Sequence, residues 1–184
     1  MSSAGRAVRE ETPAFVRARK RAMRFEDEYA AFYRAEFQHV VRTSYVIVHD
    51  LQRAEEVAQE AFIQLLIHWR KVSRYQQPSA WVRRVAIRIA SRSARRERIR
   101  PTLEHRTDAP PAFTSQDIDL LNAVKQLPRQ QRAAVALFYF EDRALPEVAH
   151  ILGCSHATAK VHVFNARRRL AQLLGEEVVH ADRL

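Results

Sequence analysis

Glycine and cysteine are scarce in this chain of 184 residues, which contains three glycines and one cysteine. No G-x-G-x-x-G or G-x-x-x-x-G-K pattern occurs, so the Gly-rich loops that let the backbone of nucleotide-binding enzymes approach a phosphate are excluded. The single cysteine, Cys154, cannot form a disulfide bond within the chain, which is consistent with a cytoplasmic location. We therefore expect neither a nucleotide cofactor nor a disulfide framework.

Long apolar runs and catalytic motifs are missing as well. No apolar stretch approaches the about 18 residues that a membrane-spanning helix needs, and the N-terminus lacks the apolar core of a signal peptide. The eight histidines show neither an H-E-x-x-H motif nor a spacing that pairs them with a cysteine, so we expect no metal site. No carboxylate dyad or nucleophile–base spacing supports catalysis. The sequence predicts a cytoplasmic protein that is not an enzyme, needs no cofactor and does not insert into a membrane.

Positive charge is abundant and concentrated. The formal net charge is +10 and the isoelectric point is near 10.6. Residues 83–100 hold eight arginines and one acid, and residues 6–24 hold seven basic residues and two acids. A focused basic stripe favours DNA or RNA as a partner, although an anionic membrane surface could attract the same charge.

Apolar residues recur at helical spacing throughout the first half of the chain. Steps of three and four residues connect Phe25 to Val48, Ala54 to Trp69, and Trp81 to Ala90, which predicts three amphipathic helices. All seven prolines lie between such runs, as expected for residues that separate helices. Both tryptophans, Trp69 and Trp81, fall on the apolar stripes, so we expect both in the core.

The order of these segments predicts an all-α fold with two small helical domains joined by a flexible linker. A helical bundle should occupy residues 25–99, and a second helical domain should occupy residues 116–175. Residues 100–115 lose the periodicity and gather three prolines, a composition typical of an extended linker. Residues 1–24 are expected to form a mobile basic extension, and residues 176–184 a short tail.

A helix-turn-helix is the most informative pattern in the second domain. Residues 146–152 read as a short helix that buries Val148, Ala149 and Leu152. Gly153 supplies the turn, and Ser155 is placed to cap a second helix from His156 to about Leu174. In that helix the inward positions should be Ala159, Val163, Ala166 and Leu170. Such a second helix typically enters the major groove of DNA.

Two sets of motifs together resemble one known family. Residues 54–62 read Ala-Glu-Glu-Val-Ala-Gln-Glu-Ala-Phe, close to an A-E-D-x-x-Q-E-x-F signature, and residues 81–86 read Trp-Val-Arg-Arg-Val-Ala. The second domain adds Leu127-Pro128 and residues 166–170, Ala-Arg-Arg-Arg-Leu. In this order and spacing they resemble the bacterial sigma factors of the extracytoplasmic function (ECF) group, in the sigma-70 family.

The resemblance implies a promoter-specific initiation factor with three groups of contact residues. The acidic part of the second helix would bind the β′ clamp of core RNA polymerase through Glu55, Glu56, Gln59 and Glu60. The loop after that helix and the third helix would bind the minus-10 promoter element through Arg74, Tyr75, Gln76, Gln77, Arg84, Arg88, Arg92 and Arg95. The helix-turn-helix would bind the minus-35 element through Ser155, His156, Thr158, Lys160, Val161, Phe164, Asn165, Arg167 and Arg168.

The resemblance also implies further partners. The second domain would contact the β flap of the polymerase, and a separate anti-sigma protein would control the factor. An acidic helix face on an otherwise basic chain is better suited to a protein than to DNA, because DNA would repel it. The loop residues combine cations, an aromatic ring and amides, which suits an unstacked base of a melted strand.

Two other functions fit parts of the sequence. In a response-regulator-like transcription factor, residues 45–50 would be a strand that ends in a phosphoacceptor, Asp50. Such a receiver needs repeated strand–helix units, whereas the pattern here stays helical. A small RNA-modifying enzyme would use the basic helix to hold its substrate, but it would also need catalytic groups at a suitable spacing. Binding to core RNA polymerase would separate a sigma factor from both.

Overall fold

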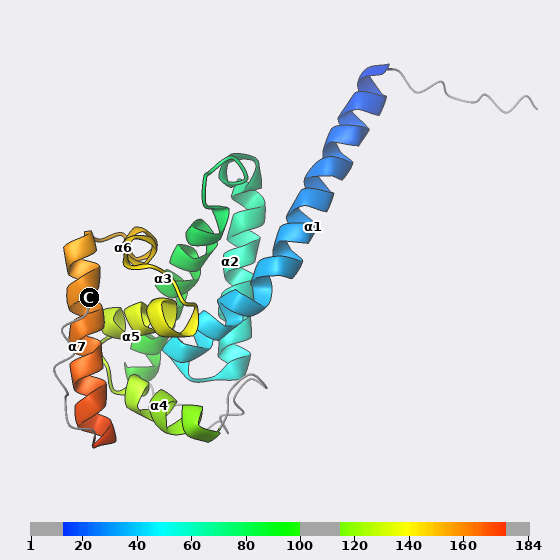
Figure 1. Cartoon of the computed structure of the whole chain (residues 1–184). Helices are drawn as coiled ribbons and strands as arrows, with labels where there is room; N and C mark the ends of the chain where they lie inside the picture. The colour runs from blue at the N-terminus through cyan, green and yellow to red at the C-terminus, as the bar shows by residue number, and fades with distance from the viewer. Residues whose placement is uncertain (1–12, 100–114, 176–184) are drawn as a thin grey trace, which may run out of the picture. The chain divides into compact units, whose positions relative to one another are not determined.

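The computed structural model describes residues 13–99 and 115–175, and these residues form helices and short connections without a β-strand (Figure 1). The helices are α1 (Pro13–Val48), α2 (Leu51–Val72), α3 (Pro78–Ile99), α4 (Ser115–Lys125), α5 (Arg129–Val135), the π-helix η1 (Ala136–Phe140), α6 (Leu145–Leu152) and α7 (His156–Leu174). The all-α class predicted from periodicity is confirmed. The expected extension, linker and tail fall largely outside the described residues.

The chain divides into two compact units, with the boundary inside α1 between Ala35 and Glu36. The first unit consists of α1 up to Ala35. It carries an exposed ion pair between Arg24 and Glu28 at 3.1 Å and a Tyr29–Tyr33 contact with ring centroids 6.4 Å apart. Its helix begins at Pro13, 12 residues before the start that the periodicity predicts, so residues 13–24 of the expected basic extension are helical.

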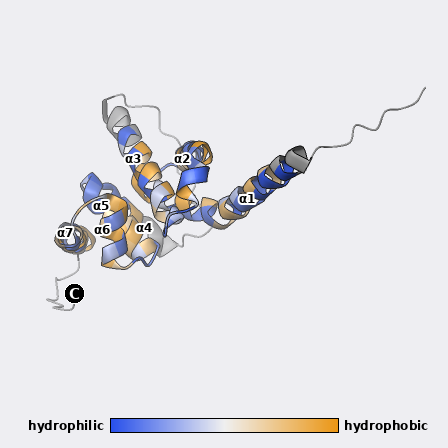
Figure 2. Cartoon of the chain, turned by 90° about the horizontal axis from the view of Figure 1, so that it is seen from above, coloured by the Kyte–Doolittle hydropathy of each residue, from blue (hydrophilic) through white to orange (hydrophobic). Residues whose placement is uncertain are grey.

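In the second unit, the end of α1 packs with α2 and α3 into a bundle. Alternating hydrophobic and hydrophilic residues along these helices are visible in Figure 2. Phe37 contacts Phe62 with ring centroids 5.7 Å apart. Asp50 caps α2 by accepting a hydrogen bond from the Arg53 N–H at 2.6 Å. The deeply buried side chains of the bundle include Val40, Val46, Ile47, Ala54, Val57, Phe62, Leu65, Val72, Val82 and Ala86.

The helices α4 to α7 surround a second group of buried side chains. Gly153 ends α6 with a φ of 70°, a left-handed conformation that glycine adopts without a steric penalty. Ser155 then begins α7, and its hydroxyl accepts a hydrogen bond from the Thr158 N–H at 3.1 Å. The turn and the cap therefore form the helix-turn-helix that the sequence predicts.

The inward positions of α7 are confirmed, because Ala159, Val163, Ala166 and Leu170 are all buried. In α6 the prediction is partly wrong. Val148 and Ala149 are buried as expected, but the third buried residue is Ile151, and Leu152 is only half-buried. Among the tryptophans, Trp69 lies in the core, whereas Trp81 is half-buried and contacts His68.

His49 occupies the tight turn between α1 and α2 and is strongly buried. Its φ is 57°, and its ring lies edge-on to that of Tyr45. Burial lowers the pKa of His49 to about 3, and the positive charges of Arg132 and Lys125 act in the same direction. The folded chain thus keeps this imidazole neutral at pH values where an unfolded chain, with an ordinary histidine pKa of about 6.5, binds a proton.

This difference predicts a loss of stability in mild acid. As the pH falls from about 6.5 towards 3, the unfolded state gains a proton at His49 that the folded state does not bind, so unfolding becomes more favourable. Between pH 7 and pH 5 this residue should lower the free energy of unfolding by about 2 kcal/mol. Urea unfolding of the wild type and of His49→Asn at both pH values measures the effect, since asparagine tolerates the left-handed backbone without titrating. An equal pH dependence in the two proteins would contradict it.

Candidate nucleic-acid interface

One face of α2 combines acidic and apolar side chains. The predicted residues Glu55, Glu56, Gln59 and Glu60 are all exposed. The same face also exposes three large apolar side chains, Ile63, Leu66 and Ile67, which are 59%, 44% and 71% exposed. We name these seven residues the α2 surface, because their spacing of three and four places them along one side of the helix.

The apolar half of the α2 surface was not predicted. Periodicity assigned Leu66 to the core beside Leu65, but only Leu65 is buried. The sequence does contain a sign of this apolar surface. Ile63 and Ile67 are large apolar residues at positions outside the core stripe, so they could have been predicted to be exposed. Exposed isoleucines that cluster on one helix face mark an interaction site more often than isolated ones do.

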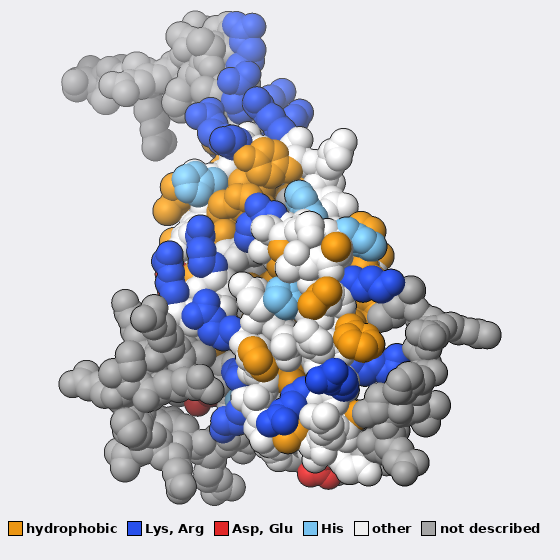
Figure 3. Space-filling model, turned by 90° about the vertical axis from the view of Figure 1, so that its left-hand side faces the viewer, with side chains coloured by type: hydrophobic (Ala, Val, Ile, Leu, Met, Phe, Trp, Pro, Cys, Tyr) orange, Lys and Arg blue, Asp and Glu red, His pale blue; other side chains and the backbone are white. Residues whose placement is uncertain are grey.

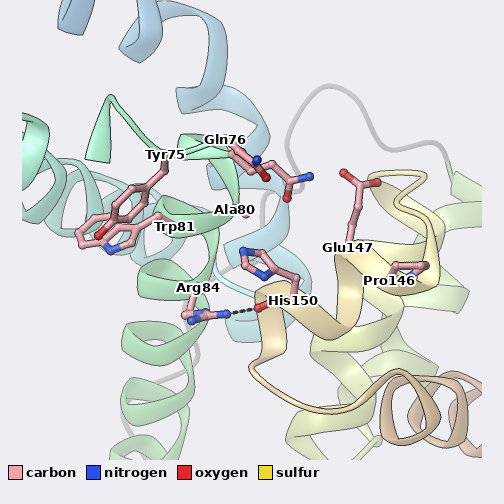
Figure 4. Close-up of a pocket in the computed structure, with 9 residues that line it drawn as sticks. Tyr75, Gln76, Ala80, Trp81, Arg84, Pro146, Glu147 and His150 are labelled. Carbon is pink, nitrogen blue, oxygen red and sulfur yellow. Dashed lines mark hydrogen bonds between the residues drawn. The ribbon is translucent and has the colours of Figure 1, made fainter. Parts of the chain in front are cut away.

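The connection between α2 and α3 carries the predicted loop residues Arg74, Tyr75, Gln76 and Gln77, and all four are exposed. The Tyr75 side chain is 41% exposed, and Pro78 begins the next helix. The loop borders a cavity of about 490 Å³ (Figure 4). Its other walls come from α3, through Ala80, Trp81 and Arg84, and from α6, through Pro146, Glu147 and His150.

Three arginines of α3 lie on one exposed face. Arg84, Arg88 and Arg92 are four residues apart and all exposed, which aligns them along the helix. The Arg84 guanidinium donates hydrogen bonds to two backbone carbonyls of α6, that of Ile151 at 3.1 Å and that of His150 (Figure 4). The predicted contact Arg95 lies where the structure describes no side chains.

The basic stripe of residues 83–100 is not a single surface that faces solvent or DNA, because Arg83 is buried. Its side chain is 1% exposed and forms ion pairs with Glu36 and Glu141. A guanidinium held in the core by two carboxylates is not available to a phosphate. Nothing in the residue types indicates this difference, because Arg83 and Arg84 are adjacent and chemically identical.

The exposed side of α7 combines polar, cationic and apolar residues. The side opposite the buried stripe carries Val161, Phe164, Asn165 and Arg168. Val161 is 53% exposed and Phe164 is 55% exposed. All nine predicted minus-35 residues are exposed: Ser155, His156, Thr158, Lys160, Val161, Phe164, Asn165, Arg167 and Arg168. Ser155 and Thr158 also serve the helix itself, since their hydroxyl oxygens lie 2.8 Å apart at the cap.

The face of the molecule shown in Figure 3 carries many Lys and Arg side chains and few acidic ones. Hydrophobic and histidine side chains lie between the cations. Within the described ranges, no group of three or more His, Cys, Asp or Glu could hold a metal ion. No helix in the same part of the chain is both long and apolar enough to cross a membrane.

Two family models match the chain, one over the helical bundle and the other over the helix-turn-helix part. The model for sigma-70 region 2 matches residues 32–99, and the model for sigma-70 region 4 matches residues 117–170. The first range ends with α3, and the second covers α4 to α7 as far as Leu170. We refer to these parts of the chain as region 2 and region 4.

Several curated proteins are similar to the chain. It is 27% identical to the RNA polymerase sigma-H factor of Pseudomonas aeruginosa over 75% of its own length and 82% of that protein. It is 31% identical to the ECF RNA polymerase sigma factor SigM of Mycobacterium tuberculosis over 53% of its length and 52% of that protein. The match to the probable RNA polymerase sigma factor RfaY of Xanthomonas campestris, at 26% identity, covers 70% of the chain and only 36% of RfaY.

Two solved structures share the fold. The sigma factor RpoE from Bartonella quintana, in complex with the anti-sigma factor NepR, matches with a TM-score of 0.68 and 21% identity over 85% of this chain and 99% of that one. CnrH, in complex with the cytosolic domain of CnrY, matches with a TM-score of 0.63 and 15% identity over 82% and 89% of the two chains.

The helix-turn-helix and the cations exposed on α3 and α7 are typical of a helical DNA-binding protein. The two family models and the relatives then place it more narrowly. The chain belongs to the sigma-70 family, in its ECF group. Members of this family are non-catalytic subunits of RNA polymerase that direct initiation at promoters.

Proposed function

We propose that this chain binds core RNA polymerase and directs transcription initiation at promoters with matching minus-10 and minus-35 elements. One observation carries the proposal: helices of the same chain expose surfaces of opposite chemistry. The α2 surface is acidic and apolar, whereas α3 and α7 expose cations. The first surface suits a protein, and the other two suit DNA.

The α2 surface fits the β′ clamp of the polymerase. Its apolar half, Ile63, Leu66 and Ile67, would supply the area that is buried on binding. Its acidic half would orient the encounter with a basic partner surface. In region 4, contacts to the β flap would hold the helix-turn-helix at the distance of the minus-35 element.

The polymerase contact predicts two different kinetic defects. Charge reversal at Glu55 and Glu56, to lysine, should slow association with core enzyme on the order of tenfold at low salt, with a smaller effect at high salt. Ile67→Ala should instead accelerate dissociation. Stopped-flow or surface-binding kinetics with core enzyme separate the two effects. Lysine at the exposed pair Glu26 and Asp27 is the matched control and should leave both rates unchanged.

The loop between α2 and α3 suits a melted minus-10 strand. Tyr75 offers an exposed ring for stacking, and the neighbouring Gln76 and Gln77 offer amide donors and acceptors to a base edge. On α3, a row of three exposed cations can pair with successive phosphates of the strand: Arg84, Arg88 and Arg92. Melting would draw on this binding free energy.

The exposed side of α7 suits the minus-35 duplex. Asn165 can form paired hydrogen bonds with an adenine, and Val161 and Phe164 can contact thymine methyl groups, the apolar feature that the major groove offers. Lys160, Arg167 and Arg168 can pair with phosphates. Large apolar side chains that would otherwise face water thereby gain a partner.

A methyl-deletion experiment tests this assignment at the level of single atoms. Replacing a contacted thymidine of the minus-35 duplex by deoxyuridine removes only the methyl group, which should weaken binding about fourfold at a buried methyl. One of the two variants, Val161→Ala or Phe164→Ala, lacks the side chain that contacts the methyl group. In that variant the same replacement should leave duplex binding unchanged. Arg168→Ala is the comparison, because it should weaken all sequences alike and lower the salt slope by about one. If no thymidine responds in wild type although the duplex binds specifically, the apolar contact is refuted.

We also propose control by an anti-sigma protein. RpoE, which shares the fold, was solved in complex with the anti-sigma factor NepR, and CnrH in complex with the cytosolic domain of CnrY. On this chain the partner would cover the α2 surface or the basic face of α3 and thus compete with polymerase or DNA.

Competition makes the proposal testable. A candidate regulator from the source organism should lose affinity when the α2 surface carries Ile63→Ser and Ile67→Ser, and added core enzyme should displace it from the wild type. Ternary binding of regulator and core enzyme to one chain, with full transcription, would contradict control by sequestration.

A further inference from the structure

The first half of α1, the dark blue end of this helix in Figure 1, carries a row of cations on one face. A helix brings residues three, four and seven positions apart onto the same side. The residues at these spacings are Arg17, Lys20, Arg21 and Arg24, and all four are exposed. At 1.5 Å per residue the row covers about 10 Å of the helix. We name these four residues the α1 basic face.

The α1 basic face concentrates charge of one sign. Residues 17–24 contain five cations and no acid. Like charges three or four positions apart destabilise a helix, and this face contains four such pairs: Arg17 with Lys20 and Arg21, and Arg24 with Lys20 and Arg21. The ion pair of Arg24 with Glu28 is exposed on both sides, and such pairs add little stability. A bound polyanion would relieve the repulsion that remains.

The described side chains of this stretch add nothing to a core. Arg17 and every residue from Arg19 to Arg24 are exposed, and the first described residue of α1 that is fully buried is Val40. In most proteins a helix is stabilised by packing an apolar face against the rest of the fold. Here the helix presents its cations at the surface instead, so core packing does not explain the composition of the stretch.

Duplex DNA is the polyanion that fits this row best. Its phosphates follow one another along each strand at about 3.4 Å of axis, so a row of about 10 Å runs beside about three of them. An anionic membrane also attracts basic helices, but such a helix needs large apolar side chains on its other face. Within residues 17–24, Met23 is the one large apolar residue. The same chain exposes further cations on α3 and α7, which also favours DNA.

We propose that the α1 basic face is a further DNA contact, which binds the phosphates of a duplex without reading its sequence. The face lies before residues 32–99, which the region 2 model matches. It is also separate from every residue assigned above to a promoter element. The choice of DNA among polyanions rests on the proposed function. The contact adds affinity for any duplex and leaves the choice of promoter to the α2–α3 loop, α3 and α7.

The test measures how binding of the full chain to a fluorescent duplex without promoter sequence depends on salt. Each phosphate contact adds about 0.9 to the slope of log affinity against log salt concentration. The double variant Lys20→Gln and Arg21→Gln should therefore lower the slope by about two and weaken binding on the order of tenfold at about 0.1 M salt. Glutamine is a good helix former, so the helix is kept.

The matched control is the double variant Arg19→Gln and Arg34→Gln. Both arginines are exposed on α1, and their positions place them on other sides of the helix than the α1 basic face. The control removes the same charge from the same helix and should keep a slope close to that of the wild type. An equal loss of slope in the two double variants, or an unchanged slope in both, would overturn the proposal.

A second measurement shows directly whether DNA lies against this helix. Met23, which is 54% exposed, is replaced by cysteine, and Cys154 is replaced by serine. An iron chelate attached at position 23 generates hydroxyl radicals that cleave nearby DNA backbone. It should cut the bound duplex, and the cuts should weaken when Lys20→Gln and Arg21→Gln are added. A bound duplex that is not cut would contradict the contact.

The outcomes separate this proposal from its rival and from the proposed function. If phosphatidylserine vesicles bind the chain more tightly than the duplex does, with the same dependence on Lys20 and Arg21, the partner is a membrane and the proposal fails. Unchanged slopes with intact promoter-dependent transcription would overturn the α1 contact alone. A lowered slope in the Lys20 and Arg21 variant, without any binding to core enzyme, would support the α1 contact and refute the sigma-factor function.

Discussion

A buried positive charge organises the second compact unit. The guanidinium of Arg83 cannot lose its proton in a protein, so it needs carboxylates wherever it is buried. Glu36 comes from α1 and Glu141 from the turn after η1, so two distant parts of the sequence are tied to α3. Because a helix turns by about 100° per residue, an inward Arg83 places Arg84 on the outside, at the end of α6. The position of one arginine thereby sets the contact of the next.

The same logic explains how the chain separates surfaces of different chemistry. Region 2 exposes arginines on α3, and it exposes acids and isoleucines on one face of α2, so one small bundle presents two surfaces of different chemistry. Region 4 repeats the division on a single helix, α7, which buries small apolar residues on one side and exposes Asn165 and arginines on the other. The chemistry of each surface follows from which face of its helix the core leaves free.

Most of the helices could be predicted from the sequence, because apolar periodicity reports directly which face is buried. Gly153 and Ser155 identified the turn and the cap of the helix-turn-helix for the same reason, since each acts locally. Periodicity does not say what a face packs against. It could not distinguish the buried Arg83 from the exposed Arg84, and it assigned Leu66 to the core although only its neighbour Leu65 is buried.

The contacts between regions 2 and 4 could not be predicted from the sequence either. The Glu141–Arg83 pair joins residues 58 positions apart across a linker, and nothing in the spacing of either residue indicates the other. The candidate site was therefore predicted residue by residue, through family resemblance, whereas the hydrogen bonds of Arg83 and Arg84 emerged only from the structure. The exposed positions of α2, α3 and α7 are compatible with the predicted contacts, which remain predictions until binding is measured.

Promoter-dependent transcription is the most direct test of the central claim. Core RNA polymerase reconstituted with the full chain would transcribe a library of genomic fragments from the source organism, and the start sites would be mapped. The account predicts discrete starts, each preceded by a shared minus-10 and minus-35 pair at constant spacing, and none with core enzyme alone. Starts that do not depend on the chain, or that share no sequence upstream, would contradict it.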